Sequence, residues 1–187
     1  TSESGGGLRL QHTLQSIPNV IHATANHQFH CQQVTSDSLV REQWGLERVA
    51  VADGWSMADG SGIVVAIIDT GIDWTHPDLQ ENIWFNSGED DGNGTPFQYD
   101  TELGWVLDPA DANGIDDDNN GLVDDVIGYD FTDAPEFPAV GDYLDADRDP
   151  FDEHRHGTIV ASVAGAVTDN GVGIAGVAPG VKIMPLR

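Results

Sequence analysis

Two residues of this sequence stand where they could act together in acid–base chemistry. Asp69 directly follows the apolar run 63–68, and His156 precedes a run of small residues that begins at Thr158. A carboxylate that orients an imidazole, and an imidazole that takes a proton from a hydroxyl, are two members of a nucleophilic triad. The alternative interpretations are a turn residue for Asp69 and a structural histidine for His156.

The apolar run 63–68 predicts the strand that positions Asp69. A run this short, with mostly β-branched residues, is typical of a strand buried on both faces of a parallel sheet. Thr70 and Gly71 then supply turn chemistry. Open α/β sheets keep their active sites at the carboxyl ends of parallel strands, so this position suits a functional carboxylate.

A second segment predicts the helix that positions His156. Residues 158–167 are almost all small or β-branched, and the alanines and glycine among them would let a helix press against a neighbouring backbone. We therefore expect a buried central helix here. Further apolar runs predict strands at 126–131 and 181–186. The order strand, strand, helix, strand indicates an α/β fold with a parallel sheet.

Residues 81–153 hold most of the carboxylates of the chain. A solvated loop is the ordinary interpretation of such a segment. Residues 116–125 instead match the first half of a calcium-binding loop, with oxygen side chains at alternate positions and a glycine at the turn. The distal glutamate of that pattern is missing, since Ile127 occupies its position, so we expect a shorter calcium loop. Its candidate ligands are Asp116, Asp118, Asn120 and Asp124.

Composition excludes several classes of partner. The chain has 187 residues and a formal net charge of −25, from 32 acidic and 7 basic residues. Nucleic acids and anionic membrane surfaces are excluded as partners because their phosphates require lysine and arginine. Bound cations would relieve the excess of negative charge. No apolar run reaches the roughly 20 residues of a membrane-spanning helix, so we expect no membrane insertion.

A group of imidazole and thiol side chains lies near the beginning of the sequence. It consists of His22, His27, His30 and Cys31. A zinc site is one interpretation, since these groups bind zinc, but the spacing matches no compact ligand pattern. Surface histidines on a short strand or helix are the other interpretation. Cys31 is the sole cysteine, so no disulfide forms within the chain.

Four segments resemble the subtilisin-like serine peptidases. Residues 67–73 and 76–79 resemble the family's aspartate signature, and residues 156–162 resemble its histidine signature. Residues 43–46 are similar to the opening of the mature domain in many members. Residues 176–179 are similar to the stretch that leads into the strand after the histidine helix. Two long motifs in the correct order make this resemblance specific.

The resemblance implies a parallel-sheet α/β fold with helices on both faces, incomplete at its C-terminal end. Asp69 would orient His156, which would be the general base of a monomeric endopeptidase, secreted or at the cell surface and bacterial in origin, that cleaves proteins and peptides. Residues 1–34 would be the end of an inhibitory propeptide that binds the rest of the protein. Residues 35–187 would be the N-terminal part of the peptidase domain, with an acidic insertion at about 81–153.

The resemblance also implies calcium as the cofactor. The acidic segment is similar to calcium-rich insertions in some members of the family. A second calcium site is implied elsewhere in the chain. Its expected ligands are Asp78, Asn170, Val172 and Ile174.

The sequence departs from the family pattern in two ways. Arg155, Ile159 and Ser162 replace a usual glycine, histidine and glycine around the histidine signature. The Gly-Thr-Ser-Met-Ala motif that carries the nucleophile does not occur in these 187 residues. We therefore expect no peptidase activity from this chain alone. The alternative is a non-catalytic calcium-binding or interaction module on the same scaffold.

Overall fold

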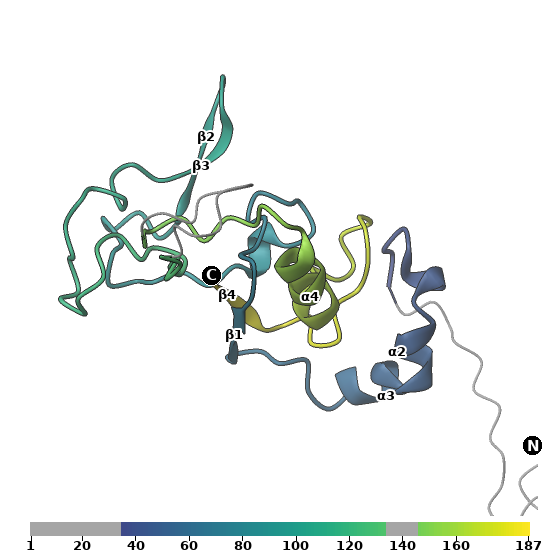
Figure 1. The fold of residues 1–187 in the computed structure, drawn as a ribbon. Coiled ribbons are helices and arrows are strands. Elements are labelled where there is room, and N and C mark those ends of the chain that lie inside the picture. The colour runs from purple at the N-terminus through teal and green to yellow at the C-terminus, as the bar shows by residue number, and fades with distance from the viewer. Residues whose placement is uncertain (1–34, 134–145) are drawn as a thin grey trace, which may run out of the picture. The chain divides into compact units, whose positions relative to one another are not determined.

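The computed structural model describes residues 35–133 and 146–187, all within a compact unit that spans Gln33–Arg187. Short helices come first, and a strand, a hairpin, a longer helix and a final strand follow (Figure 1). In order, the elements are η1 (Val40–Glu42), α2 (Trp44–Arg48), α3 (Val51–Trp55), β1 (Val64–Ile68), η2 (Gln80–Asn82), β2 (Phe97–Asp100), β3 (Gly104–Leu107), α4 (His156–Gly165) and β4 (Lys182–Leu186).

The sheet is built on a parallel pair, β1 and β4. Its register runs from Val64 opposite Lys182 to Ile68 opposite Leu186. Parallel neighbours need a long crossover, and α4 lies within it and packs beside both strands (Figure 1). This arrangement confirms the predicted α/β class with a parallel sheet.

The core lies where the sheet, α4 and the loops after β1 meet. Ile72, Leu79, Ile127 and Ile183 are fully buried and belong to one hydrophobic cluster. Burying a side chain of this size stabilises the folded chain by roughly 1.5–3 kcal/mol. Ile72 and Leu79 follow β1 closely in sequence, so the same cluster anchors the turn that carries Asp69.

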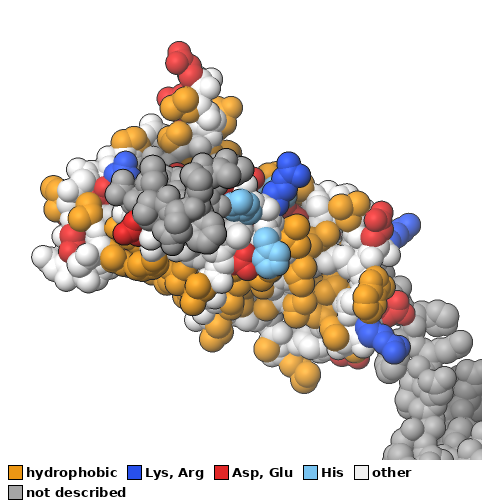
Figure 2. Space-filling model, viewed as in Figure 1, with side chains coloured by type: hydrophobic (Ala, Val, Ile, Leu, Met, Phe, Trp, Pro, Cys, Tyr) orange, Lys and Arg blue, Asp and Glu red, His pale blue; other side chains and the backbone are white. Residues whose placement is uncertain are grey.

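The expectation that β1 and α4 are buried all round is wrong for the described residues. Burial alternates along β1, and Ile68 is 81% exposed. On α4, Ala161 and Gly165 are buried as expected, but Ile159 is 61% exposed. Figure 2 shows hydrophobic side chains gathered beside the exposed histidines, over β1 and α4. The reason is that β1 pairs with one strand only, so its other edge and one face have no neighbour among the described residues.

The strand expected at 126–131 does not form as a regular element. Tyr129 makes an isolated parallel bridge to Leu186, and Asp130 makes an antiparallel bridge to Asp147. Gly128 explains the interruption. Its φ is 145°, and a Cβ there would lie 2.0 Å from the carbonyl oxygen of Pro185. The segment therefore follows β4 closely without completing a third strand.

A hairpin inside the acidic segment was not expected from the sequence. β2 and β3 pair antiparallel, from Phe97 opposite Leu107 to Asp100 opposite Gly104. Trp74 stacks on Phe97 with 5.5 Å between ring centroids, which ties the hairpin to the loop after β1. The interpretation of residues 97–107 as part of a solvated loop is therefore wrong. The two strands have only four residues each and are flanked by carboxylates, so the sequence did not indicate them.

Some predictions fall outside the described residues. These are the propeptide segment 1–34 and the histidine–cysteine group His22, His27, His30 and Cys31. Within the described residues, no helix has the length and apolar character needed to span a membrane.

Candidate active site

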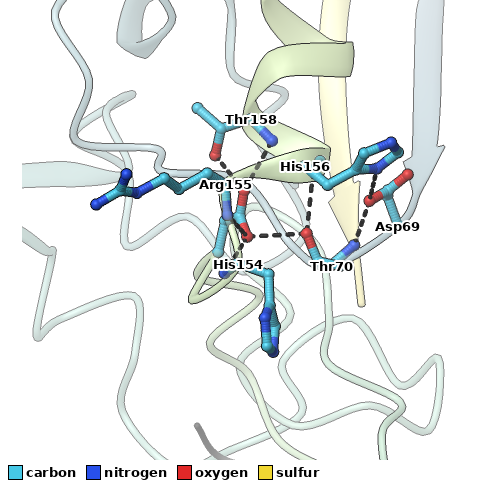
Figure 3. Close-up of polar contacts among 8 residues, drawn as sticks. Asp69, Thr70, His154, Arg155, His156 and Thr158 are labelled. Carbon is cyan, nitrogen blue, oxygen red and sulfur yellow. Dashed lines mark hydrogen bonds and ion pairs between the residues drawn. The ribbon is translucent and has the colours of Figure 1, made fainter. Parts of the chain in front are cut away.

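The structure brings Asp69 and His156 together. Asp69 follows β1, and its backbone N–H donates to the carbonyl of Leu186 on β4. His156 is the first residue of α4. Its Nδ1 lies 2.7 Å from Oδ1 of Asp69, although the two residues are 87 positions apart (Figure 3).

Glycine at two positions allows this approach. A Cβ on Gly157 would lie 2.1 Å from the carbonyl oxygen of Gly71 and 3.2 Å from Cβ of Asp69. Gly71 itself has a φ of 93°, and a Cβ there would lie 2.6 Å from the carbonyl oxygens of Pro150 and Phe151. The first turn of α4 therefore sits directly on the turn after β1, which places His156 over Asp69.

Electrostatics fix the protonation of the pair. The hydrogen bond with His156 lowers the pKa of Asp69, and a bond from the Thr70 N–H (2.8 Å) lowers it further. An ionised carboxylate only accepts hydrogen bonds, so Nδ1 of His156 carries the proton that it shares with Asp69. In the neutral ring Nε2 is then the basic nitrogen. The His156 side chain is 69% exposed, so this nitrogen is open to a reacting group.

Asp152 organises the start of α4, and the sequence analysis missed it. Its Oδ1 accepts from the Thr70 hydroxyl and from the backbone N–H groups of His154 and Arg155, each at 2.8 Å. Its Oδ2 accepts from the backbone N–H (2.9 Å) and the hydroxyl (2.6 Å) of Thr158. Burial acts to raise the pKa of Asp152, but the bonds led by Thr158 outweigh it and lower the pKa.

Asp152 therefore links the two halves of the site. Thr70 accepts from the Gly157 N–H (3.0 Å) with the same hydroxyl that donates to Asp152, so one chain of hydrogen bonds joins the β1 turn to α4 (Figure 3). Arg155 occupies the N-cap position of α4, three residues after Asp152, so the preference for aspartate at a helix N-cap does not single out Asp152. Its long-range contact with Thr70 has no local signal.

The structure separates the predicted ligands of the calcium loop from one another. Asp118 groups with Glu89 and Asp125, and one oxygen of each lies within 4.8 Å of the others. Glu89 is 1% exposed, and its Oε2 has no hydrogen-bond partner. Burial first, then the charges of Asp125 and Asp118, raise the pKa of Glu89. Glu89 carried no signal in the sequence because it lies 29 positions before Asp118.

The other predicted ligands of this loop make protein contacts. Asp116 accepts from the N–H groups of Asn120 and Gly121, each at 3.0 Å. The Asn120 amide donates to Asp118 (3.1 Å) and to Asp125. Asp124 pairs with Arg148 and accepts from the Gly114 N–H (2.8 Å), which removes it from the Glu89 group.

The four residues predicted for the second calcium site lie close together and are joined by hydrogen bonds. Asp78 is 2% exposed, and its two oxygens accept from the Asn170 amide and from the Ile174 N–H, each at 2.9 Å. Val172 donates its N–H to Oδ1 of Asn170 (2.7 Å). The loop wraps tightly, since a Cβ on Gly173 would lie 2.1 Å from Oδ2 of Asp78. The structure thus brings all four predicted residues into one loop around Asp78.

The parallel strands β1 and β4, with α4 in the crossover between them, give this chain part of an α/β fold, and the Asp69–His156 contact lies at the carboxyl end of β1. Residues 60–187 match the sequence model of the subtilase family, peptidase S8. The chain belongs to the subtilase family, which confirms the resemblance seen in the sequence.

Known proteins from several organisms are similar to this chain. Subtilisin-like protease 1 of Plasmodium berghei is 32% identical over 145 residues, which are 76% of this chain and 19% of that protein. An extracellular protease of Xanthomonas campestris is 31% identical and covers 95% of this chain and 27% of its own length. The thermophilic serine proteinase of a Bacillus species is 28% identical over 93% of this chain and 30% of that protein.

A solved structure of a protease from Pseudoalteromonas arctica superimposes with a TM-score of 0.54 at 26% identity, over 82% of this chain and 38% of that one. The chain therefore spans between about a fifth and a third of the length of these curated relatives. Because the relatives include both bacteria and Plasmodium, they do not support the prediction of a bacterial source over a eukaryotic one.

Proposed function

We propose that this chain supplies the aspartate and the histidine of an Asp-His-Ser triad in a serine endopeptidase. The observation that carries the proposal is the 2.7 Å contact between Nδ1 of His156 and Oδ1 of Asp69. Nε2 of His156 would take the proton of a serine hydroxyl as that oxygen attacks a peptide carbonyl. Asp69 would hold the ring in the required tautomer and stabilise the imidazolium that forms.

The nucleophile must come from outside these residues. The sequence contains no Gly-Thr-Ser-Met-Ala motif, so His156 has no serine of that kind to activate. The purified chain is therefore expected to leave casein uncleaved. Steady cleavage that a serine-directed inhibitor blocks would contradict this expectation.

The proposed pairing is tested on the chain itself. In ¹⁵N NMR spectra recorded against pH, His156 should hold its proton on Nδ1 in the neutral ring, because Asp69 accepts it there. Asp69→Asn should shift the neutral His156 ring toward the other tautomer, because the acceptor for the Nδ1 proton is lost. Asp73→Asn, four positions further along, is the matched control and should leave the His156 signals unchanged. Identical His156 spectra in the wild type and Asp69→Asn would refute the pairing.

The substrates and the location follow from the same proposal. Protein or peptide chains are the substrates, and the protein is secreted or at the cell surface, as the extracellular protease of Xanthomonas is by its name. Residues 1–34 would act as the end of a propeptide that binds the peptidase domain. A synthetic peptide of residues 1–34 should then bind a chain that begins at Thr35.

Calcium is proposed as the cofactor at two positions. The first keeps Asp118 from the predicted loop but replaces Asp116 and Asp124 with Glu89 and Asp125. The orphaned, buried Oε2 of Glu89 fits a cation held with Asp118 and Asp125, since all three offer hard oxygen ligands. Rotation of the Asn120 amide would turn its oxygen to the same ion. The loop of Asp78, Asn170, Val172 and Ile174 is the second position. The ions would neutralise buried carboxylates and hold both loops.

Removal of calcium tests this proposal. One ion at 100 times its dissociation constant stabilises the folded chain by about 2.7 kcal/mol. A chelator should therefore lower the melting temperature by several degrees, and added calcium should restore it. A chain that melts at the same temperature in chelator and in calcium would remove the cofactor from the proposal.

A non-catalytic calcium-binding or interaction module is the second candidate function. The specific observation in its favour is the exposed apolar surface of β1 and α4, such as Ile68 and Ile159, which suits a protein partner. The coding sequence after Arg187 separates the two candidates. A Gly-Thr-Ser motif on the downstream segment favours the peptidase, and an unrelated domain favours the module.

A further inference from the structure

A second carboxylate group lies at the base of the β2–β3 hairpin. Asp90 and Asp91 precede β2, and Asp111 follows β3. Because the two strands are antiparallel, the segments before and after the hairpin are brought side by side. One oxygen from each of the three carboxylates lies within 4.8 Å of the others.

The three carboxylates share one pattern of hydrogen bonding. Oδ1 of Asp111 accepts from the Asp91 N–H (2.8 Å), Oδ1 of Asp90 accepts from Gly92 (2.9 Å), and Oδ1 of Asp91 accepts from Asn93 (3.0 Å). The other oxygen of each accepts no hydrogen bond from any residue in 35–133 or 146–187. Backbone amides thus fix each carboxylate and leave one oxygen of each open.

The burial of Asp111 indicates a bound ligand, independently of its closeness to Asp90 and Asp91. Asp111 is completely buried, and its Oδ2 is a buried atom without a hydrogen-bond partner. A buried charge without a partner is strongly unfavourable. Among the residues that the structure describes, no ion pair with lysine, arginine or histidine includes Asp90, Asp91 or Asp111. The missing partner is therefore a cation from solution or a proton.

The arrangement of the oxygens favours the cation. Three carboxylates converge, and one oxygen of each lies within 4.8 Å of the others. A proton would satisfy one oxygen only, whereas one divalent ion can contact an oxygen of each carboxylate, including the buried Oδ2 of Asp111.

We propose that Asp90, Asp91 and Asp111 bind a calcium ion that closes the base of the β2–β3 hairpin. Calcium takes oxygen ligands at about 2.3–2.6 Å, so two ligands on opposite sides of one ion are up to about 5 Å apart. The spacing of at most 4.8 Å fits one ion within the group. Water and backbone carbonyls would complete its coordination.

The ion would also secure a contact near the catalytic pair. The hairpin reaches the loop after β1 through the stack of Phe97 on Trp74. Trp74 in turn packs edge-on against Phe151, which is next to Asp152. The proposed site is distinct from the Glu89 group, which uses Asp118 and Asp125, and it does not depend on the proposed peptidase function.

Calcium titration of the chelator-stripped chain tests the proposal, with stoichiometry measured by calorimetry. Asp111→Asn keeps the shape and an oxygen that can accept from Asp91, but it removes the charge. It should bind one calcium equivalent fewer than the wild type. Asp108→Asn is the matched control, since both Asp108 oxygens already accept from Ala110 and Asn93, and it should retain the full stoichiometry. Asp118→Asn should lose a different equivalent, so that the double variant with Asp111→Asn loses two.

Two results would overturn the proposal. The first is an unchanged stoichiometry and affinity in Asp111→Asn. The second is a higher melting temperature of Asp111→Asn in chelator together with unchanged calcium binding, which would mean that Asp111 is simply a protonated buried acid. If circular dichroism shows that Asp111→Asn does not fold, Asp91→Asn takes its place, with the same expected loss of one equivalent.

Discussion

The substitution Asp152→Asn tests whether one buried carboxylate holds Asp69 and His156 in contact. Asp152 accepts five hydrogen bonds, three at Oδ1 and two at Oδ2 from Thr158. An asparagine can place its oxygen where Oδ1 accepts three hydrogen bonds, but it then presents an NH₂ group to Thr158 in place of Oδ2. The Thr158 hydroxyl can rotate and accept from that NH₂ group, whereas the Thr158 N–H cannot, so its bond is lost.

The size of the effect follows from these contacts. A hydrogen bond to a charged group contributes about 1.5–3 kcal/mol, and the four that remain weaken when the charge is removed. We therefore expect Asp152→Asn to lower the free energy of unfolding by about 2–4 kcal/mol. Because these bonds hold the first turn of α4 against Thr70, the His156 ring should also lose its fixed contact with Asp69.

Urea denaturation in saturating calcium measures the first effect, as a lower midpoint with an unchanged slope. NMR of His156 measures the second. Asp100→Asn is the matched control, because Asp100 also accepts two backbone N–H groups but lies in the hairpin turn. Asp100→Asn should lower the free energy of unfolding by less than about 1 kcal/mol and leave the His156 signals unchanged. An Asp152→Asn variant with the wild-type midpoint and wild-type His156 signals would refute the reasoning.

Three further predictions concern the same region. Arg155 has a φ of 70°, a left-handed backbone conformation that costs a residue with a side chain about 1–2 kcal/mol. Arg155→Gly should therefore raise the melting temperature by a few degrees. A lower melting temperature would show that the substitution relieves no strain. Gly157→Ala should lower the free energy of unfolding in urea by about 1–3 kcal/mol, because the added Cβ meets the Gly71 carbonyl. Gly45→Ala is the control and should not destabilise, since nothing lies within 4 Å of its added Cβ. Equal effects of the two substitutions would contradict this account. Folding lowers the pKa of Asp69, so this carboxylate stabilises the folded chain fully above about pH 3.9, and the stabilisation is lost as the pH falls through the lower pKa of the folded state. The free energy of unfolding measured against pH should lack this acid-dependent loss in Asp69→Asn. Superimposable stability curves for the variant and the wild type would count against the prediction.

The sequence predicted the parts of the site that have local causes. An apolar run that stops at Asp69 and a helix of small residues near His156 are patterns of neighbouring residues, and both elements formed where expected within two residues. The α/β class with parallel strands followed from their order and is confirmed. The catalytic roles of the two residues, by contrast, remain predictions.

The hairpin and the hydrogen-bonded position of Asp152 escaped prediction for a shared reason. The strands of the hairpin have only four residues each, and the carboxylates that flank them indicate loop. Asp152 looks like one more member of an acidic segment until Thr70, 82 positions away, is found beside it. Neither feature can be read from a window of neighbouring residues.

What the amino-acid sequence determined by itself is the family, the fold class and the identity of the two polar residues at the ends of β1 and α4. Tertiary structure decided which of the many carboxylates are buried, which are paired with arginine, and which, like Glu89 and Asp111, keep an unpartnered oxygen inside the protein. The physical reason is that the cost of a carboxylate depends on its solvation and on charges brought near it by folding. Nothing in the sequence distinguishes Asp111 from Asp108. In the folded chain, Asp111 is the one of the two that is fully buried with an oxygen that accepts no hydrogen bond.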